Sequence, residues 1–427
     1  MYLIYSALLM AALVLGIPYW LWQGFRRTRY WSGLGERLGR VPQRIRELDT
    51  RPLIWVHAVS VGEVLAVAGL VQQLRARFPG YRVLISTTTV SGQTLAAKRF
   101  GQEKVFFFPL DLPFAVRAYL RALNPRLIVV AETEFWPNFL RLAKSSGATI
   151  AVVNARISDR SLPGYRRFRA LLAAVLQNVD LFLAQTENDA HRLVEIGAPA
   201  DRVQTAGNVK FDIPPPAEIA IVTQLRSALS KAAPIIVCGS TMDGEEPLLL
   251  RAFINILASH PQAFLILAPR HPERFDKVDA LIAQLGIPRW RRSRWSGEPI
   301  QGGVLLLDSI GELASIYSLA QIAFVGGSLV ARGGHNILEP AQFGVATVTG
   351  VSYENFRDIV DLFRVQDAVR IAGPAELPLL LLDLANQPDE CAALGQRALK
   401  VLQGQTGATE RTLEALATLL KSRSAAS

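Results

Sequence analysis

The chain has 427 residues, of which 50% are hydrophobic and 19% charged, and this balance excludes a mostly disordered protein because two separate apolar cores can be built. Its two cysteines, Cys238 and Cys391, lie far apart in the sequence, which excludes a disulfide framework and a cysteine-rich zinc module. Both thiols are expected in the core, and the formal net charge of +10 makes the distribution of charge the next question.

Residues 1–25 contain no charged side chain and are rich in leucine. A helix of ~20 apolar residues can cross the hydrocarbon core of a bilayer, and Tyr19, Trp20 and Trp22 stand where an interfacial aromatic belt would end such a span. This segment is therefore predicted to be an uncleaved, single-pass membrane anchor. A buried core helix, or a helix that lies in the membrane interface, is the alternative, because Pro18 can kink or shorten the span.

An arginine-rich stretch follows directly. Between Arg26 and Arg51 there are eight arginines against three acidic residues. The positive-inside rule places Arg26, Arg27 and Arg29, and with them the rest of the chain, on the cytoplasmic side. A second basic cluster, Arg289 to Arg294, has no aromatic residues repeated along a basic groove, so it is interpreted as a solvated or anion-facing surface and no nucleic-acid partner is expected.

From Leu53 onward, short apolar runs alternate with amphipathic helices, such as one predicted from Gly62 to Phe78, a pattern typical of parallel sheets covered on both faces. Strands are predicted at 53–56, 82–86, 105–108, 127–131, 149–153 and 181–185, and in a second series at 235–238, 264–267, 304–307, 322–325 and 346–348. The run Ile213-Pro214-Pro215-Pro216 separates the two series, because it cannot continue a helix or a central strand.

The predicted fold class is therefore α/β, with two doubly wound, Rossmann-like domains that face each other across a cleft. The predicted domains are an anchor at 1–25, an N-terminal domain at 26–212, a linker at 213–217, and a C-terminal domain with terminal helices at 218–427.

Several common chemistries are absent from the sequence. It contains no G-x-x-x-x-G-K-[ST] phosphate loop, no H-E-x-x-H and no C-x-x-C motif. Gly33-Leu34-Gly35 precedes the first strand instead of following it, so a nicotinamide site is not expected there. No D-x-D pair is present to hold Mg²⁺, which favours metal-independent chemistry without a cofactor.

Polar or glycine-rich segments follow several of the predicted strands, where free N–H groups at helix starts can bind phosphate. They lie at 57–63, 86–92, 132–138, 239–246, 269–274 and 326–340. Taken singly, a serine such as Ser60 or Ser240 is usually a helix cap, and a histidine such as His271 or His335 is usually a structural polar group. Their occurrence together, in one ordered series, favours a functional site.

The ordered set of segments resembles the Kdo transferases, the 3-deoxy-D-manno-octulosonic acid transferases of lipopolysaccharide biosynthesis. The matching segments are Glu36-Arg37-Leu38-Gly39, HAVSVGE at 57–63, ETEFWPN at 132–138, NARISDRS at 154–161, QTENDA at 185–190, GNVKFD at 207–212, GSTMDGEE at 239–246, PRHPER at 269–274 and GGSLVARGGHNILEPA at 326–341. Met242 and Asp243 depart from the histidine-containing GSTHEGEE-like version that is expected there.

The resemblance implies an inverting, metal-independent glycosyltransferase of GT-B architecture that transfers Kdo from CMP-Kdo to a lipid A precursor, lipid IVA. It also implies that the N-terminal half receives the acceptor and the C-terminal half binds the donor. The implied location is the inner membrane, with the catalytic domains on its cytoplasmic face. An apolar amino terminus followed by arginines suits an acceptor that carries acyl chains and phosphates.

The resemblance also suggests roles for individual residues. Glu36 is the expected general base for the acceptor hydroxyl, with Glu132 or Glu134 as the alternative acid-base group. Donor contacts are expected from Ser240, Arg270 and the N–H groups after Gly326 to the phosphate, from Glu339 to the ribose hydroxyls, from Asn336 to the nucleotide, and from Lys210 when the domains close. The remaining expected substrate-binding residues are Ser60, Gly62, His271, Gly327 and Ser328.

Two competing classes of function share some of these features. Another membrane-associated GT-B transferase would use the same anchor and cleft with a UDP-sugar donor. A non-enzymatic basic protein that binds membranes or nucleic acid would depend on the net charge of +10 alone, and its binding would fall steeply with salt.

Overall fold

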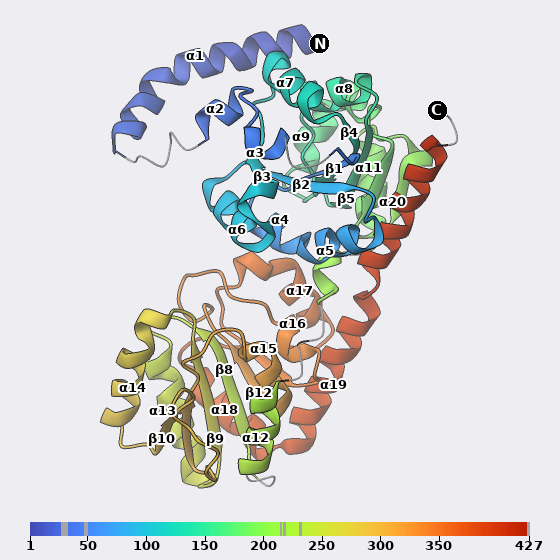
Figure 1. Cartoon of the computed structure of the whole chain (residues 1–427). Coiled ribbons are helices and arrows are strands. Elements are labelled where there is room, and N and C mark those ends of the chain that lie inside the picture. Colours follow the sequence, from blue (N-terminus) through green and yellow to red (C-terminus); the bar gives the residue numbers. More distant parts are fainter. Residues whose placement is uncertain (27–32, 47–49, 214–215, 217–218, 230–232, 425–427) are drawn as a thin grey trace. The chain divides into compact units, whose positions relative to one another are not determined.

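The computed structural model describes residues 1–26, 33–46, 50–213, 216, 219–229 and 233–424. Its contacts divide the chain into two compact units, unit 1 with Met1–Asp212 and Gln405–Ser427, and unit 2 with Ile213–Gly404 (Figure 1). Arg27 and Arg29 of the arginine-rich stretch, and residues 214, 215 and 217 of the predicted linker, lie outside the described residues.

Unit 1 contains a parallel sheet with the strand order β3-β2-β1-β4-β5-β6-β7. The strands are β1 Leu53–His57, β2 Arg82–Thr87, β3 Val105–Phe107, β4 Pro125–Ala131, β5 Thr149–Ala155, β6 Leu181–Ala184 and β7 Val203–Thr205. The strand order reverses between β1 and β4, so the carboxyl ends of these two strands form the position at which open α/β sheets bind ligands.

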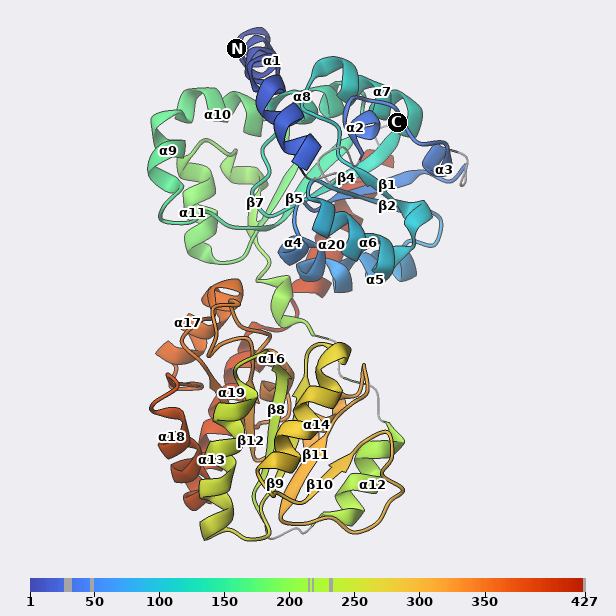
Figure 2. The same cartoon turned by 90° about the vertical axis from the view of Figure 1, so that its left-hand side faces the viewer.

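Helices cover both faces of this sheet (Figure 2). They are α1 Tyr2–Arg26, α2 Leu34–Arg37, α3 Gln43–Arg46, α4 Val61–Ala66, α5 Ala68–Arg77, α6 Val90–Phe100, α7 Pro113–Leu123, α8 Pro137–Ser145, α9 Leu162–Arg167, α10 Arg169–Leu176, α11 Glu187–Glu195 and α20 Ala408–Ser424. The helix predicted from Gly62 to Phe78 is two helices, because the backbone leaves the helical conformation at Val67 (φ −88°, ψ 2°).

The two faces of the sheet carry separate cores. Trp55 and Phe139 belong to the core beneath α7 and α8, and Val56 and Leu70 belong to the core beneath α4 and α5. Because alternate residues of a strand point to opposite faces, the neighbours Trp55 and Val56 lie in different cores.

The C-terminal helix α20 packs on unit 1. Leu413, Leu416 and Leu420 are buried in the core beneath α4 and α5, and the Asp212 carboxylate accepts hydrogen bonds from the N–H groups of Gly407, at 2.6 Å, and of Thr409. The prediction that 218–427 forms one C-terminal domain is therefore wrong for α20, because its apolar stripe completes the first core.

Unit 2 contains a second parallel sheet, with the strand order β10-β11-β9-β8-β12-β13-β14. The strands are β8 Ile235–Thr241, β9 Phe264–Pro269, β10 Arg289–Arg291, β11 Gly303–Leu306, β12 Ile322–Val325, β13 Ala346–Thr349 and β14 Arg370–Ile371. The helices are α12 Ala220–Ala228, α13 Glu246–Ser259, α14 Phe275–Gln284, α15 Leu313–Ile316, α16 Leu338–Ala341, α17 Arg357–Val365, α18 Leu377–Asn386 and α19 Pro388–Gln405. The order reverses between β8 and β12, which places the second ligand-binding edge there.

Both cysteine predictions are confirmed, since Cys238 and Cys391 are free and buried in the core of unit 2. The basic cluster at 289–294 is largely neutralised by carboxylates. Arg291 pairs with Asp276 at 2.6 Å and with Asp308 at 2.9 Å, and Arg292 pairs with Glu312 at 2.9 Å. Within the described part of the chain, no helix combines the length and the apolar character needed to cross a membrane.

Candidate functional site

Three carboxyl groups gather at the β1/β4 edge of unit 1. Glu63 lies in α4, after β1, and Glu132 and Glu134 follow β4; these three residues are called the acidic cluster. Burial raises the pKa of Glu63 to about 7, and the nearby Glu132 and Glu134 carboxylates add to the rise. Burial and the Glu132 charge also raise the pKa of Glu134. The cluster can therefore hold a proton near neutral pH, as an acid-base site requires.

Lys210 belongs to the same edge of unit 1. Its Nζ lies 2.9 Å from Glu132 Oε1, and its loop is held by Asn154 Oδ1, which accepts a hydrogen bond from the Val209 N–H at 3.1 Å. Glu132 and Asn154 both adopt left-handed backbone conformations, with φ of 56° and 55°. Such strain, of order 1 kcal/mol or more for a non-glycine residue, is typical of functional sites. The predicted reach of Lys210 toward the donor remains a prediction.

Ser60 acts as a helix cap that orients Glu63. Its Oγ donates to Glu63 Oε1 at 2.9 Å and accepts from the Glu63 N–H at 3.4 Å, while the Val59 N–H donates to Glu63 Oε2 at 2.8 Å. This resembles a capping box, except that Glu63 accepts from the N–H of Val59, one residue before the cap. A Cβ on Gly62 would meet only Ser60 Oγ, at 3.9 Å, so no close approach demands glycine there. The sequence analysis missed Glu63, which the S-x-x-E spacing at 60–63 could have indicated.

Glu36 lies at the same edge of the sheet, but beside β3. Its Oε1 accepts from Arg44 at 2.8 Å and its Oε2 accepts from the Phe107 N–H at 2.8 Å, with 18% of the side chain exposed. Two strands separate β3 from β4, which corresponds to about 14 Å between their axes at ~4.8 Å per strand. The structure therefore does not bring Glu36 into the acidic cluster, and the two carboxyl sites are separate.

The β8/β12 edge of unit 2 brings together predicted donor-binding residues. Ser240 lies at the end of β8 with a strained φ of 56°. The Arg270 N–H donates to the neighbouring Thr241 O at 2.9 Å, and the Gly326 N–H donates to Gly239 O at 2.9 Å. Segments that follow β8, β9 and β12 thus meet at one edge.

The N–H groups after Gly326 already have a partner within the protein. Those of Gly327, Ser328 and Leu329 donate to the Glu245 carboxylate at 2.7, 2.9 and 2.8 Å, and the Met242 N–H adds a fourth bond at 2.8 Å. Glu245 is fully buried. The prediction that these N–H groups hold the donor phosphate is therefore wrong for this structure, because an internal anion occupies them.

Ser328 is also a structural residue. Its Oγ donates to Val325 O at 2.6 Å and accepts from the Gly350 N–H at 2.8 Å, and the residue is fully buried. Substrate therefore has no access to this hydroxyl, and its predicted binding role is wrong. Asn336 lies before the short helix α16, and its Oδ1 accepts from the Leu338 N–H at 3.1 Å.

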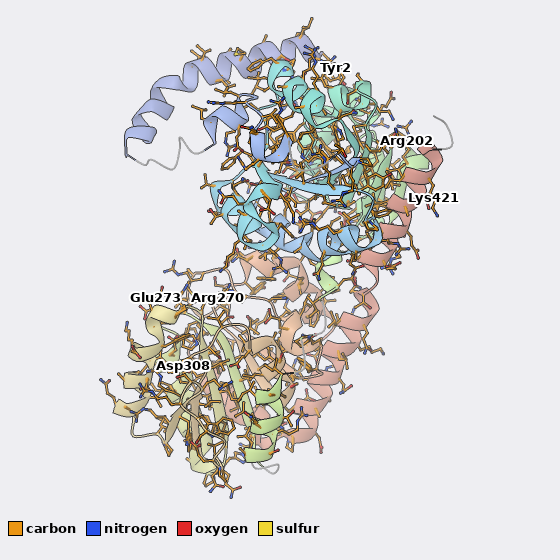
Figure 3. The ribbon with its side chains drawn as sticks, viewed as in Figure 1. Tyr2, Arg202, Arg270, Glu273, Asp308 and Lys421 are labelled. Atoms are coloured by element: carbon orange, nitrogen blue, oxygen red, sulfur yellow. The ribbon has the colours of Figure 1, made fainter. Side chains whose placement is uncertain are left out.

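Arg270, His335 and Glu339 lie beside these segments. Burial lowers the pKa of His335 to about 4, with smaller contributions from Arg270 and His271, and burial raises the pKa of Glu339 against the opposing effect of Arg270. These couplings place Arg270, His335 and Glu339 close together. Arg270 is exposed at the surface of unit 2 (Figure 3), and a Cβ on Gly327 would come within 3.0 Å of the His335 ring. His335 was not among the predicted site residues.

The rest of the GSTMDGEE and PRHPER segments forms an ion-pair network. The buried Glu246 pairs with Arg274 at 2.5 Å and accepts from Thr241 Oγ1 at 2.8 Å. Asp243, one of the two residues that depart from the expected pattern, pairs with Arg274 at 2.9 Å and with Lys277 at 3.1 Å. Asp243 therefore takes part in the ion pairs that join the 239–246 and 269–274 segments.

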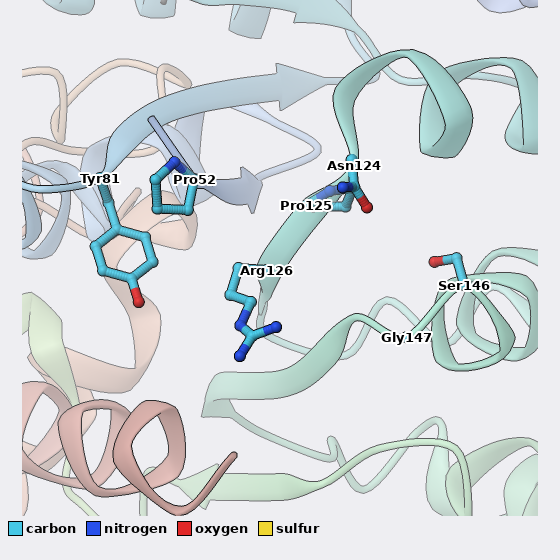
Figure 4. Close-up of a pocket in the computed structure, with 7 residues that line it drawn as sticks. All are labelled: Pro52, Tyr81, Asn124, Pro125, Arg126, Ser146 and Gly147. Atoms are coloured by element: carbon cyan, nitrogen blue, oxygen red, sulfur yellow. The ribbon is translucent and has the colours of Figure 1, made fainter. Parts of the chain in front are cut away.

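One pocket of unit 1 lies at the opposite edge of its sheet (Figure 4). It is lined by Pro52, Tyr81, Asn124, Pro125, Arg126, Ser146 and Gly147. Pro52 and Tyr81 precede β1 and β2, so the pocket lies at the amino ends of the strands, away from the ligand-binding edge. Among the described residues, no group of three or more His, Cys, Asp or Glu is arranged to hold a metal ion.

Comparisons with known proteins agree on one family. Residues 32–213 match the sequence profile of a family described as "3-Deoxy-D-manno-octulosonic-acid transferase (kdotransferase)". A 3-deoxy-D-manno-octulosonic acid transferase from Haemophilus influenzae is 34% identical over 367 residues, covering 85% of this chain and 86% of that protein. The protein of the same name from Bordetella pertussis is 35% identical over 415 residues, covering 93% and 95%.

The fold also has solved counterparts. The crystal structure of MurG from Acinetobacter baumannii matches with a TM-score of 0.54 over 86% of this chain and 99% of that chain. The sequences are 14% identical, so this likeness concerns the fold alone.

Proposed function

This chain belongs to the family of 3-deoxy-D-manno-octulosonic acid (Kdo) transferases, and from that premise we propose that it takes Kdo from CMP-Kdo and transfers it to lipid IVA. Kdo transfer in lipopolysaccharide biosynthesis follows from the family, whose members match 85% and 93% of the chain in the two comparisons above. The donor, the acceptor and the cytoplasmic face of the inner membrane as location are the proposed parts.

The cationic edge of unit 2 supports a donor with a single phosphate. Arg270 is exposed, and no carboxylate of the described residues lies within salt-bridge distance of it, so its guanidinium can make a charge-assisted contact with a phosphate oxygen. Ser240 can add a hydroxyl at the same edge. Glu339, close to Arg270, is placed to accept hydrogen bonds from ribose hydroxyls, and the Asn336 amide nitrogen to contact the nucleotide.

The proposed reaction is a direct displacement at the anomeric carbon of Kdo. The acceptor hydroxyl gives its proton to the Glu36 carboxylate while its oxygen forms the new bond to the anomeric carbon. The bond from that carbon to the CMP phosphate breaks, and its electron pair leaves with CMP. Arg270 stabilises the departing phosphate, and such stabilisation is often the largest catalytic contribution. No metal ion takes part in these steps.

Glu36 can act as the base only after a change of partners. Its two oxygens accept hydrogen bonds from Arg44 and from the Phe107 N–H, so an acceptor hydroxyl must share or displace one of them. Arg44 lies 2.8 Å away and would also stand beside an acceptor phosphate. The acidic cluster is the alternative acid-base site, because Glu63 and Glu134 both have raised pKa values.

Mass spectrometry of lipid IVA incubated with the protein and a supply of CMP-Kdo tests the proposal. A mass increase of one or more Kdo residues is expected, and the increment gives the number transferred. A UDP-sugar offered in place of CMP-Kdo is expected to give no product. An unchanged mass with CMP-Kdo, or a product formed only with the UDP-sugar, would contradict the proposed donor.

A further inference from the structure

Helix α1 has two faces of opposite character. The half-buried residues among positions 2–16 are Tyr2, Tyr5, Ser6, Leu9, Leu13 and Gly16, and their spacing of three or four residues places them on one face of the helix. The exposed residues of positions 3–15 are Leu3, Ile4, Ala7, Leu8, Met10, Ala11, Ala12, Val14 and Leu15, all of them apolar. A helix in contact with water shows the reverse arrangement, with polar residues outward.

Polar contacts hold the first turn of α1 on unit 1. The Tyr2 hydroxyl donates to Ala174 O at 3.1 Å, and the Arg141 guanidinium lies over the Tyr2 ring, 4.5 Å from its centre. Ser6 Oγ accepts from Asn138 Nδ2 at 2.9 Å. The face that carries Tyr2, Tyr5 and Ser6 is called the docked face.

The docked face of α1 lies against the N-terminus of α8. The Asp111 carboxylate accepts from the N–H groups of Asn138, at 3.0 Å, and Phe139, at 2.7 Å, which caps α8. Burial and the charge of the nearby Asp111 carboxylate raise the pKa of Tyr5, so this hydroxyl lies close to Asp111. Burial raises the pKa of Asp111 to about 6. Tyr5 therefore lies beside the carboxylate that accepts the N–H groups at the start of α8.

These contacts fix the direction of α1. A helix of 25 residues is about 37 Å long, which by length alone exceeds the ~30 Å thickness of a hydrocarbon core. A crossing helix would place Tyr2 on the opposite side of the membrane from the domain that begins near Gly33. Tyr2 instead bonds to α10 and α8 of that domain. While the docked face is bound, both ends of α1 lie on the same side.

Positive charge accompanies the apolar face. A shallow pocket between the 39–46 segment and α7 is lined by Arg40, Arg46 and Arg121, with no carboxylate among its lining residues. None of the three arginines has an ion-pair partner among the described residues. Helices α1, α7 and α8 lie at the same end of unit 1 in both views (Figures 1 and 2), and Phe114 of α7 is 53% exposed there.

We propose that α1 lies flat in the membrane interface, with its apolar face in the lipid and its docked face bound to unit 1, and does not cross the bilayer. The occupant of the apolar face is an anionic bilayer surface, because apolar side chains beside unpaired arginines match acyl chains beneath anionic headgroups. This inference rests on the membrane location in the proposed function and replaces the predicted single-pass topology.

The arrangement also connects the lipid surface to the acidic cluster of unit 1. The segment 132–138 begins with Glu132 of the acidic cluster and ends with Asn138, which bonds to Ser6 of α1. A lipid acceptor in the same leaflet as α1 therefore arrives within one short segment of the acidic cluster.

Cysteine labelling in sealed membrane vesicles tests the topology. One cysteine is placed in a short polar extension before Met1, and a reference cysteine replaces Lys421, which is exposed on α20 of unit 1 (Figure 3). The native Cys238 and Cys391 are buried and give little background. A membrane-impermeant maleimide is expected to label both introduced cysteines from the same side. Labelling from opposite sides would overturn the inference, whether or not the protein transfers Kdo.

Flotation with vesicles that contain anionic phospholipid tests the occupant. In the variant L8S/L15S, side chains that are 66% and 81% exposed become polar, and the vesicle-bound fraction is expected to fall on the order of tenfold or more. The control L379S/V365S changes side chains that are 67% and 76% exposed in unit 2 and is expected to bind vesicles like the native protein. Equal binding of both variants would overturn the inference.

Two further measurements separate the possible failures. Gel filtration of L8S/L15S reports whether the apolar face instead binds a second copy of the chain, in which case a native dimer becomes a monomer and the lipid occupant is wrong. Transfer to a deacylated, water-soluble acceptor is expected to be unchanged in L8S/L15S. Loss of that transfer in the native protein would count against the proposed function and not against the position of α1.

Discussion

Glu36 and Arg270 divide the proposed reaction between a proton acceptor in unit 1 and a phosphate contact in unit 2. The substitution Glu36→Gln is expected to lower the rate of transfer by about 10²- to 10⁴-fold, the range of general-base catalysis, while CMP binds as before. The substitution Arg270→Ala is expected to weaken CMP binding by about 1.5–3 kcal/mol, the value of a hydrogen bond to a charged group. Product mass and calorimetric CMP binding measure the two effects.

Matched controls for this pair are available on the surface. Glu103 and Arg251 are exposed residues of units 1 and 2, and Glu103→Gln and Arg251→Ala are expected to change neither transfer nor CMP binding. If Glu36→Gln transferred Kdo at the native rate, the base would have to be sought in the acidic cluster.

Glu63 predicts a pH dependence of stability. Its pKa is raised from 4.5 to about 7 in the folded protein, so the folded state holds a proton that the unfolded state has lost between these values. The free energy of unfolding therefore receives a contribution that falls as pH rises from about 4.5 to about 7, by about 3 kcal/mol in total. The glutamine of Glu63→Gln cannot titrate. The free energy of unfolding of this variant, relative to that of the native protein, is therefore expected to rise by about 3 kcal/mol between pH 4.5 and pH 7.

Urea unfolding at pH 5 and pH 8 measures the difference between the two proteins. Other groups, such as the buried His57, titrate equally in both proteins and cancel from the comparison. The variant Glu187→Gln, at an exposed position in α11, is the control and is expected to follow the native protein. A Glu63→Gln curve that ran parallel to the native one would show that this carboxyl does not titrate near neutrality.

Single residues were the least predictable level of this protein. The motif glycines Gly326 and Gly327 follow a strand as predicted, but sequence spacing cannot show that Glu245, about 80 positions earlier, fills the N–H groups beside them. Both an external phosphate and an internal carboxylate satisfy such donors, so the same motif is compatible with either. The position of Glu63 could have been predicted, because an S-x-x-E spacing before a helix is visible in the sequence.

At the scale of elements, the buried strands were predictable, whereas of the four edge strands only β3 was predicted. A parallel strand covered on both faces is a continuous apolar run, such as Ile322–Val325, which is β12 as predicted. The missed strands β7, β10 and β14 all lie at sheet edges. Edge strands are commonly short and polar. For this reason the sequence of Arg289–Arg291 indicates a basic surface cluster and not a strand.

The prediction placed helix α20 in the wrong unit, because the spacing of its apolar residues does not indicate which of the two units they pack against. Leu416 is fully buried in unit 1, so Leu416→Ala is expected to destabilise that unit by about 2–5 kcal/mol. Hydrogen exchange is expected to rise across β1 and α5 and to stay unchanged across β8 and β12. The exposed neighbour Glu414→Ala is the control, and increased exchange confined to unit 2 would refute the assignment.

At the scale of the whole molecule, the chain crosses between the units twice, after Asp212 and after Gly404. A fragment that ends at residue 213 therefore lacks Leu413, Leu416 and Leu420 of its own core. We expect such a fragment to be insoluble alone and to assemble with a co-expressed 214–427 fragment, which co-purification through a tag on either one would reveal. A soluble, cooperatively folded 1–213 fragment would contradict this expectation.

The position of α20 also sets the order of events during synthesis. Most of unit 1 leaves the ribosome first, but α20 is translated only after all of unit 2. While unit 2 is being translated, roughly half of the polypeptide, the apolar surface of unit 1 that α20 later covers stays exposed. A chain that stalls before α20 is made therefore leaves unit 1 without the helix that completes one of its two cores.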